Sequence, residues 1–527
     1  MRFRFLCALT LGSCLLPSCA VAAPEGDATS RPFDVLEYVV EGNTLLDPVQ
    51  IERAVIPHLG PAKGIEAVEA AVEALEQGYR AAGYLTVFVD IPEQKVDSGV
   101  VTLRVLEGRV ERLRVTGTRY YSAGEIRRRL PALAEGGVPW FPKVQKELVA
   151  YNRAAPGRAL TPFLRPGKTP GTVEVELKAR EQFPLHGGVE VNNRETPNTS
   201  ELRLVGSLRY DNLFQRDHSF ALQYQTAPLA TSEVRVLSGT YVAPIPGSDR
   251  MIAAYGVRSR SDIAAVGDIR VAGNADIFGV RYIVPVRGSD RVSHSFTFGV
   301  DRKDFGESVT LVGADTLNNP ISYTPVSANY AATVSGQKGT TRASVTATTA
   351  LRGVLGNDDG EFQRKRFNAR ANFVAVRAEV SREHRFGAGA SWFARVGGQA
   401  AGGPLVSNEG FFAGGVDSVR GYLEAERVGD TGVFASMEVR TPRLGADEDR
   451  HVKELIGFAF VDAASVRVLQ PLPSQTAKFD LLGAGVGLRL RAWQTLSAQA
   501  AVAVPLEDGL VSRRNEPRVH FKVAYDF

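Results

Sequence analysis

The last ten residues of the chain alternate between apolar and polar side chains. A β-strand directs successive side chains to its two faces, so this segment has one apolar face and one charged face. Alternation that ends the chain on an aromatic residue is typical of the closing strand of an outer-membrane β-barrel, with lipid outside and water inside. An amphipathic edge strand of a soluble domain would alternate in the same way. The apolar face carries Val519, Phe521, Val523, Tyr525 and Phe527, and the other carries Arg518, His520, Lys522 and Asp526.

Residues 33–180 repeat one order of predicted elements: a strand, two helices and two strands. Alternation predicts the strands, and apolar residues three or four positions apart predict the helices. A glycine turn follows the first strand of each copy, at Gly42-Asn43 and at Gly117. The copy at 33–108 comprises a strand 33–40, helices 47–58 and 64–82, and strands 85–91 and 100–106; the copy at 109–180 comprises a strand 109–115, helices 123–130 and 144–152, and strands 160–164 and 173–178.

From residue 181 to residue 527 the helical periodicity gives way to alternating segments separated by turns. Residues 244–250 (PIPGSDR) return as residues 285–291 (PVRGSDR), so equivalent turns are 41 residues apart. One period holds two strands and one outer loop, or roughly 20 residues per strand, and bacterial barrels have even strand numbers. We therefore predict α+β domains followed by a barrel of sixteen antiparallel strands.

The N-terminus has the pattern of an export signal. A basic start, an apolar run from Phe5 to Leu16 and a small-residue cleavage site at Ala20-Val21-Ala22 predict a signal peptide over residues 1–22. Residues 16–19 (LPSC) loosely resemble a lipoprotein cleavage box, in which the proline fits poorly. All three cysteines lie in this signal, which excludes disulfides and cysteine-based sites from the mature chain.

The composition excludes several classes of function. A net charge of +4 is too small to indicate nucleic-acid binding, and a mean hydropathy of −0.10 suits a wall whose apolar outer residues alternate with polar inner ones. The seven histidines are scattered without metal-ligand spacing. Gly167-Lys168-Thr169 resembles the end of a P-loop, but Pro162 occupies the position of the first glycine. We expect no catalytic residue, no metal and no cofactor.

One glycine-rich segment, residues 414–422, interrupts the alternation and is therefore predicted to be a loop. Counted back from the C-terminus, it belongs to the sixth outer loop, at about residues 404–431. On the strand 455–462, Phe460 and Asp462 share the inward face, and the inward glycines of the next strand, Gly485 and Gly487 among them, leave room for a loop packed against the wall.

The repeated unit resembles the polypeptide-transport-associated (POTRA) domain. Residues 152–172, with their Pro-Gly turns, are similar to the second such domain of the two-partner secretion transporters, the hemolysin-activator and filamentous-hemagglutinin transporter family. Val419-Arg420-Gly421-Tyr422 matches the V-R-G-Y/F loop motif of the POTRA-barrel superfamily. Residues 460–462 resemble its F-x-D-x-G motif, with Ala464 in place of the glycine, and Gly485-Val486-Gly487-Leu488-Arg489 resembles its G-x-G-L-R strand.

The resemblance implies a function and the residues that serve it. The sixth loop folds into the lumen, where Arg420 and Asp462 form a latch and Gly421 and Tyr422 shape the tip. Val523, Tyr525 and Phe527 present the assembly signal to the barrel-assembly machinery, with periplasmic chaperones assisting. The protein would lie in the bacterial outer membrane with its POTRA domains in the periplasm, where their second strands and adjoining helices bind an unfolded, β-helical exoprotein for secretion through the barrel without ATP.

Family members carry a helix ahead of the first POTRA domain that plugs the pore at rest. Residues 23–32 are too short for that helix and its linker, so we expect gating mainly by the sixth loop and little change in single-channel conductance when these residues are removed. Three alternatives share part of the pattern: a factor that inserts other barrels, a passive porin, and a barrel hydrolase, for which no Ser/His/Asp set can be placed.

Overall fold

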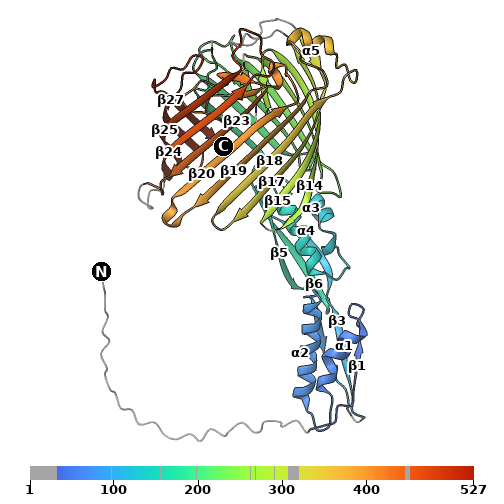
Figure 1. Ribbon diagram of the computed structural model, residues 1–527. Coiled ribbons are helices and arrows are strands. Elements are labelled where there is room, and N and C mark those ends of the chain that lie inside the picture. Colours follow the sequence, from blue (N-terminus) through green and yellow to red (C-terminus); the bar gives the residue numbers. More distant parts are fainter. Residues whose placement is uncertain are drawn as a thin grey trace, which may run out of the picture. The chain divides into compact units, whose positions relative to one another are not determined.

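The computed structural model describes residues 32–527, except residues 97, 155–156, 198, 262, 267–268, 290, 307–319 and 445–450. The predicted signal peptide and the segment 23–31 lie outside the described residues. Contacts divide the chain into two compact units, one formed mostly by residues up to 179 and the other mostly by residues 180–527 (Figure 1). Residues 117–125 and 152–159, which we placed in the second repeat, group with the second unit.

The first repeat folds as a three-stranded sheet covered by two helices. Strand β3 (Val100–Glu107) is central, with β1 (Glu37–Glu41) parallel to it on one side and β2 (Val87–Asp90) antiparallel on the other. The first strand is shorter than the predicted 33–40, because Val35 pairs only in an isolated bridge with Gly60. Helix α1 (Pro48–Val55) continues as a short 3-10 segment (Ile56–His58), and α2 spans Ile65–Ala81.

The turn after β1 explains the Gly42-Asn43 signal. Gly42 has φ +83°, and a Cβ there would lie 2.5 Å from the carbonyl oxygen of Val105, so only glycine fits. Asn43 Oδ1 accepts hydrogen bonds from the N–H of Leu46 at 3.0 Å and from the hydroxyl of Tyr79 at 2.5 Å. Burial, with a further contribution from Glu107, raises the pKa of Tyr79, which keeps its hydroxyl a donor.

The second repeat has the same topology. Its sheet order is β4-β6-β5, with β4 (Arg109–Thr116) parallel to the central β6 (Thr172–Glu181) and β5 (Arg158–Pro166) at the edge. Gly117 follows β4 with φ +76°, as Gly42 follows β1. The helices are α3 (Ala123–Arg129), a 3-10 turn (Pro131–Leu133) and α4 (Phe141–Ala154), the last of which starts three residues before the predicted 144.

Among the described residues, sixteen long strands form a closed antiparallel barrel, which confirms the predicted fold class. The short β16 (Ile321–Tyr323) extends the pairing of β15 beyond β17 and is counted with β17, and β27 closes the ring on β7. The strands are β7 (Leu185–Asn192), β8 (Arg203–Leu213), β9 (His218–Thr226), β10 (Arg235–Pro244), β11 (Met251–Arg260), β14 (Ala275–Ser289), β15 (Val292–Phe305), β17 (Pro325–Gly336), β18 (Gly339–Ala350), β19 (Val374–Arg385), β20 (Ser391–Ala401), β23 (Thr431–Arg440), β24 (Val452–Arg467), β25 (Lys478–Ala492), β26 (Leu496–Pro505) and β27 (Arg518–Asp526).

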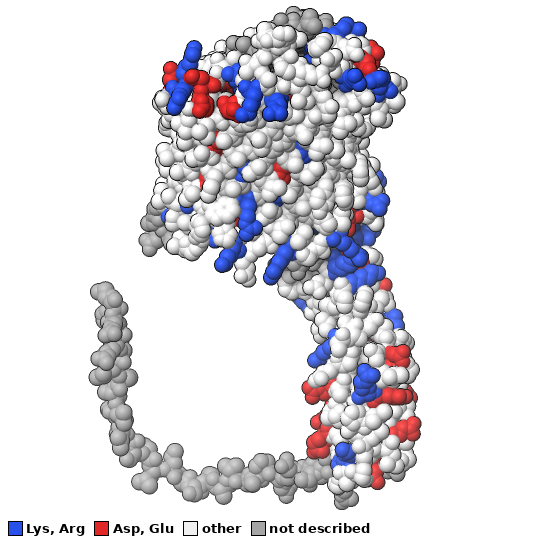
Figure 2. Space-filling view, in the orientation of Figure 1, with Lys and Arg blue, Asp and Glu red and all other residues white. Residues whose placement is uncertain are grey.

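The wall of the barrel is apolar outside and polar inside. On β27 the side chains of Val519, Val523 and Tyr525 are exposed, whereas His520 is buried. Figure 2 shows charged side chains gathered at the upper rim and a mostly uncharged wall beneath it. Such a band is the surface that lipid tails require.

Among the described residues, no helix is both long and apolar enough to cross a membrane.

Candidate functional site

The connection between β20 and β23 folds back along the inner wall of the barrel. Residues 402–430, called loop 6 here, are the sixth connection at their end of the barrel when counted from β7. Loop 6 contains a small hairpin of β21 (Phe411–Ala413) and β22 (Arg427–Gly429), and from residue 404 onward its residues are buried or half-buried. A loop packed in this way fills lumen that would otherwise be open.

Arg420 of loop 6 forms a bidentate ion pair with Asp462 of β24. Its Nε lies 2.6 Å from Oδ2 and its Nη2 2.8 Å from Oδ1, and its backbone N–H donates to Oδ2 at 3.1 Å. Ser436 Oγ supplies a fourth donor to Asp462 at 2.6 Å. The two residues are 6% and 1% exposed. A carboxylate with four donors has most of its acceptor capacity filled, and charge-assisted bonds of this kind are about twice as strong as neutral ones.

A second carboxylate, Glu438 of β23, completes the surroundings of Arg420. Its Oε2 accepts from Arg420 Nη1 at 2.9 Å, and its Oε1 accepts from Arg440 and Arg489, each at 2.7 Å. Glu438 is 2% exposed. Two carboxylates therefore meet three guanidinium groups, which makes the Arg420–Asp462 pair part of a charge network. The sequence reasoning missed Glu438 because glutamates on inward faces are common in water-filled barrels.

The inward aromatic residues and glycines form a surface on which the arginines lie flat. The guanidinium carbon of Arg420 is 3.4 Å from the centre of the Phe460 ring, and that of Arg489 is 4.5 Å from the ring of Phe458. A Cβ at Gly485 would lie 2.6 Å from Phe460, and one at Gly487 would lie 2.4 Å from Phe458. These glycines leave room for the rings, and the rings in turn face the cations.

Gly483 gives loop 6 its closest approach to the wall. A Cβ at this position would lie 2.1 Å from the carbonyl oxygen of Arg420. Leu488, the remaining residue of the G-x-G-L-R segment, is 53% exposed on the outer face. Strand β24 pairs without interruption through Ala464, so alanine in place of the motif glycine leaves the strand continuous.

The other residues of the V-R-G-Y segment are buried against the wall. Gly421 has φ +101°, and its N–H donates to His520 Nε2 of the closing strand at 2.9 Å. The Tyr422 hydroxyl donates to the carbonyl oxygens of Leu482 at 3.0 Å and Glu507 at 2.8 Å, and Val419 is fully buried. Tyr422 therefore anchors the loop to the wall.

Glu426 is a further anchor that the sequence did not reveal. Its Oε1 accepts from the backbone N–H groups of residues 510, 511 and 512 at 2.6, 2.8 and 2.8 Å, and its Oε2 accepts from Ser512 Oγ at 2.6 Å. Successive N–H groups that converge in this way form an anion-binding nest. Because the donors are backbone groups more than 80 residues away in the chain, no side-chain motif marks this contact.

The chemistry of this site is that of a held loop. Within the described ranges, no group of three or more His, Cys, Asp or Glu side chains is arranged to hold a metal ion. The polar side chains pair with one another across loop and wall, so what the arrangement can do is fix loop 6 in the lumen or release it.

These features define an outer-membrane barrel of the POTRA class. They are a closed barrel with a polar interior, an inward loop held by an arginine–aspartate pair, and two α+β repeats. A family model described as "Haemolysin secretion/activation protein ShlB/FhaC/HecB" matches residues 171–490, and one described as "POTRA domain, ShlB-type" matches residues 33–108. The chain belongs to the ShlB/FhaC/HecB family, and it is located in the outer membrane.

Curated relatives share one segment of the chain. The protein "Outer membrane transporter CdiB" of Escherichia coli O6:K15:H31 (strain 536 / UPEC) is 28% identical over 198 residues, which are 37% of this chain and 33% of that protein. The protein of the same name from Dickeya dadantii (strain 3937) is 28% identical over 182 residues, or 34% and 32% of the two chains. The match spans about one third of these relatives.

Three solved structures share the fold. CdiB from Escherichia coli has a TM-score of 0.61 at 20% identity, covering 96% of this chain and 93% of that one. CdiB from Acinetobacter baumannii has a TM-score of 0.55 at 15% identity, covering 95% and 91%. BamA from Haemophilus ducreyi lacking POTRA domains 1–3 has a TM-score of 0.58 at 15% identity, covering 94% and 100%. The fold is thus common to CdiB and BamA. The family model is what assigns this chain to the ShlB/FhaC/HecB family.

Proposed function

We propose that this protein is the outer-membrane pore of a two-partner secretion system, which recognises an unfolded exoprotein in the periplasm and passes it through its own barrel. The observation that carries the proposal is the inward loop, which fills the lumen but is held to the wall by hydrogen bonds and ion pairs. Water can replace these polar contacts when the loop leaves, while the apolar residues that loop 6 buries against the wall, such as Phe411 and Val419, add to the cost of opening. Membership of a secretion family supports the same conclusion.

Beside loop 6 the lumen keeps a polar cavity of about 410 Å³. Strands β7, β8, β9 and β27 line it, and their inward side chains include Glu190, Gln223 and Lys522. A path for an extended polypeptide needs such polar, solvated walls, because the peptide groups of the client must stay hydrogen-bonded during passage. Release of loop 6 would widen this cavity into that path.

The POTRA sheets offer edges to which a client strand can add. Strands β2 and β5 lie at the edges of their sheets, and an extended segment can pair with an exposed edge strand. At β2 the N–H of Val89 donates to Glu76 Oε1 of α2 at 3.1 Å. A client carbonyl would replace this carboxylate. The proposed client is a β-helical exoprotein, whose folding outside the cell would drive export without ATP.

The closing strand would carry the signal for assembly by the barrel-assembly machinery, after delivery by periplasmic chaperones. Phe527 exchanges two backbone hydrogen bonds with Gly187 of β7, each of 2.9 Å, and its ring lies where a Cβ of Gly187 would be, at 2.3 Å. Tyr525 and Val523 face outward beside it. The side chain of Phe527 therefore lies at the barrel seam, where it would be recognised together with the closing strand.

Secretion of the exoprotein encoded beside this chain tests the proposal. We expect the wild-type protein to release it into the medium and Arg420→Ala to lose most of that release while inserting at equal level, judged by heat-modifiable migration of the folded barrel. Arg258→Ala, at an exposed arginine of β11 whose ion-pair partner is Asp276 of β14, makes the same charge change and serves as a matched control. Absence of release by a correctly inserted wild-type barrel would favour the barrel-insertion alternative, which the BamA-like fold also accommodates.

A further inference from the structure

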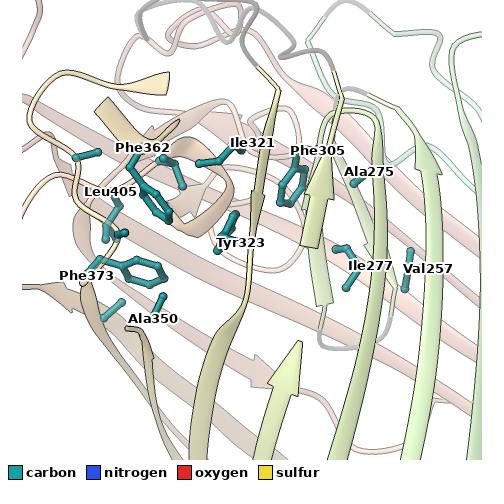
Figure 3. Packing of buried hydrophobic residues seen from close by; sticks show 14 of the residues in the cluster. Val257, Ala275, Ile277, Phe305, Ile321, Tyr323, Ala350, Phe362, Phe373 and Leu405 are labelled. Atoms are coloured by element: carbon teal, nitrogen blue, oxygen red, sulfur yellow. The ribbon is translucent and has the colours of Figure 1, made fainter. Parts of the chain in front are cut away.

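A cluster of buried apolar residues lies at the end of the barrel from which loop 6 departs. The helix α5 (Asp359–Lys365) belongs to the connection between β18 and β19, residues 351–373, called loop 5 here. Its Phe362 packs against Tyr323 of β16 and Phe373, with ring centroids 5.2 and 6.0 Å apart (Figure 3). Tyr323 and Phe362 are 0% and 1% exposed. We call these three rings, with the buried apolar residues around them, the apolar cap.

The apolar cap rests on inward-facing wall residues. Val257 of β11 and Ile277 of β14 belong to the same buried cluster, and Leu405 and Val406 join it from the start of loop 6. The lumen of a transport barrel is normally polar and hydrated. A buried apolar cluster built from two loops and the wall therefore excludes water on the side of the barrel formed by β10 to β19, while the latch fills the side formed by β23 to β27.

One buried ion pair joins loop 5 to the end of loop 6. Arg366, directly after α5, contacts Asp430 through two hydrogen bonds of 2.7 Å, and Asp430 is 0% exposed. The remaining acceptor sites of Asp430 are filled by the N–H groups of Leu405 at 2.8 Å and Leu469 at 2.6 Å. Loop 5, both ends of loop 6 and the loop after β24 therefore share this carboxylate.

Glu409 forms a second polar contact between the apolar cap and loop 6. Its Oε1 accepts from the hydroxyl of Tyr323 at 2.6 Å and from Lys303 Nζ at 2.5 Å, and it is 3% exposed. Tyr323 thus belongs to the apolar cap through its ring and to loop 6 through its hydroxyl. Movement of loop 6 out of the lumen must break both contacts or carry loop 5 with it.

We propose that the apolar cap is a second closure of the lumen, beside the Arg420–Asp462 latch, and that the Arg366–Asp430 pair holds it shut. Arg366 and Asp430 act as positioning residues, since each fixes loops and neither contacts the client. Because loop 6 contributes to both closures, the full path opens only when loop 6 leaves the latch and the apolar cap together. The closed state then depends on contacts at both ends of loop 6, so weakening either set of contacts raises the open probability.

Recordings from single molecules of the purified full chain in planar lipid bilayers test this proposal without any client. We expect Arg366→Ala to raise the open probability at least tenfold although Arg420 and Asp462 are unchanged. The double variant R366A/R420A should multiply the effects of the two single variants. Arg370→Ala, an exposed arginine in the same loop, makes the same charge change and should leave the open probability as in the wild type.

An open probability of Arg366→Ala equal to that of Arg370→Ala, in a barrel with normal heat-modifiable migration, would overturn the proposal. Asp430→Asn removes the charge of the same pair while keeping nearly the same side-chain shape. Phe362→Ala tests the apolar cap itself. These two variants keep the proposal testable if Arg366→Ala misfolds. If both open no more often than the wild type, the cap is no closure. Because conductance needs no exoprotein, the outcome is independent of the secretion assay.

Discussion

Removal of the Arg420 side chain should open the barrel. In the closed state Arg420 donates to Asp462, Glu438 and Ser436, and truncation to alanine deletes every side-chain bond of this set. Asp462, 1% exposed, then keeps Ser436 Oγ and the backbone N–H at residue 420 as donors. Glu438 loses less, because Arg440 and Arg489 still bind it.

The free-energy cost of Arg420→Ala follows from the contacts that Asp462 and Glu438 lose and keep. Breaking one partner of a buried ion pair costs about 3–5 kcal/mol, most of it from the carboxylate that stays buried without its cation. Since Glu438 stays paired and Asp462 keeps two donors, the low end, about 3 kcal/mol, applies here. At about 1.4 kcal/mol per factor of ten, the closed-to-open ratio should fall roughly 100-fold. The cost falls on the closed state alone, because water solvates Asp462 once the loop has left.

Single-channel recording measures this ratio directly as open probability. Arg420→Lys should give an intermediate rise, since lysine keeps the charge but cannot make the bidentate contact. Heat-modifiable migration confirms that each variant forms a barrel. Closed times of Arg420→Ala that match those of the wild type would refute the reasoning, because the latch would then contribute nothing to closure.

Two further predictions concern single positions of the wall. Gly483→Ala should push loop 6 off the wall and raise the open probability, because its Cβ would lie 2.1 Å from the carbonyl oxygen of Arg420; Gly206→Ala, with open space around it, is the matched control for a new side chain in a strand. Phe527→Ala should lower the yield of heat-modifiable barrel in outer-membrane fractions, through the loss of the aromatic ring over Gly187; Phe527→Tyr should retain that yield, and equal yields for both variants would contradict a role of the ring.

The sequence predicted those features that local patterns encode. The 41-residue spacing of two similar turns was enough to count sixteen strands, and the alternation of residues 519–527 showed which face of β27 meets lipid. Arg420 and Asp462 could be named as candidates because motifs mark them. Glu438, Glu426 and Asp430 could not, since most of their partners, such as Arg489, the N–H of Ser512 and Arg366, come from segments far away in the chain. Folding brings those segments together, and no periodic pattern in the sequence indicates these contacts.

The contact between Phe527 and Gly187 has a consequence for closure of the barrel. Strand β27 and Phe527 complete the ring of strands, so a chain that lacks this segment keeps an unpaired edge at β7. Unpaired edges invite pairing with other chains and aggregation. The closing strand therefore protects the barrel from aggregation as well as sealing its wall, because both depend on the same pairing of β27 with β7.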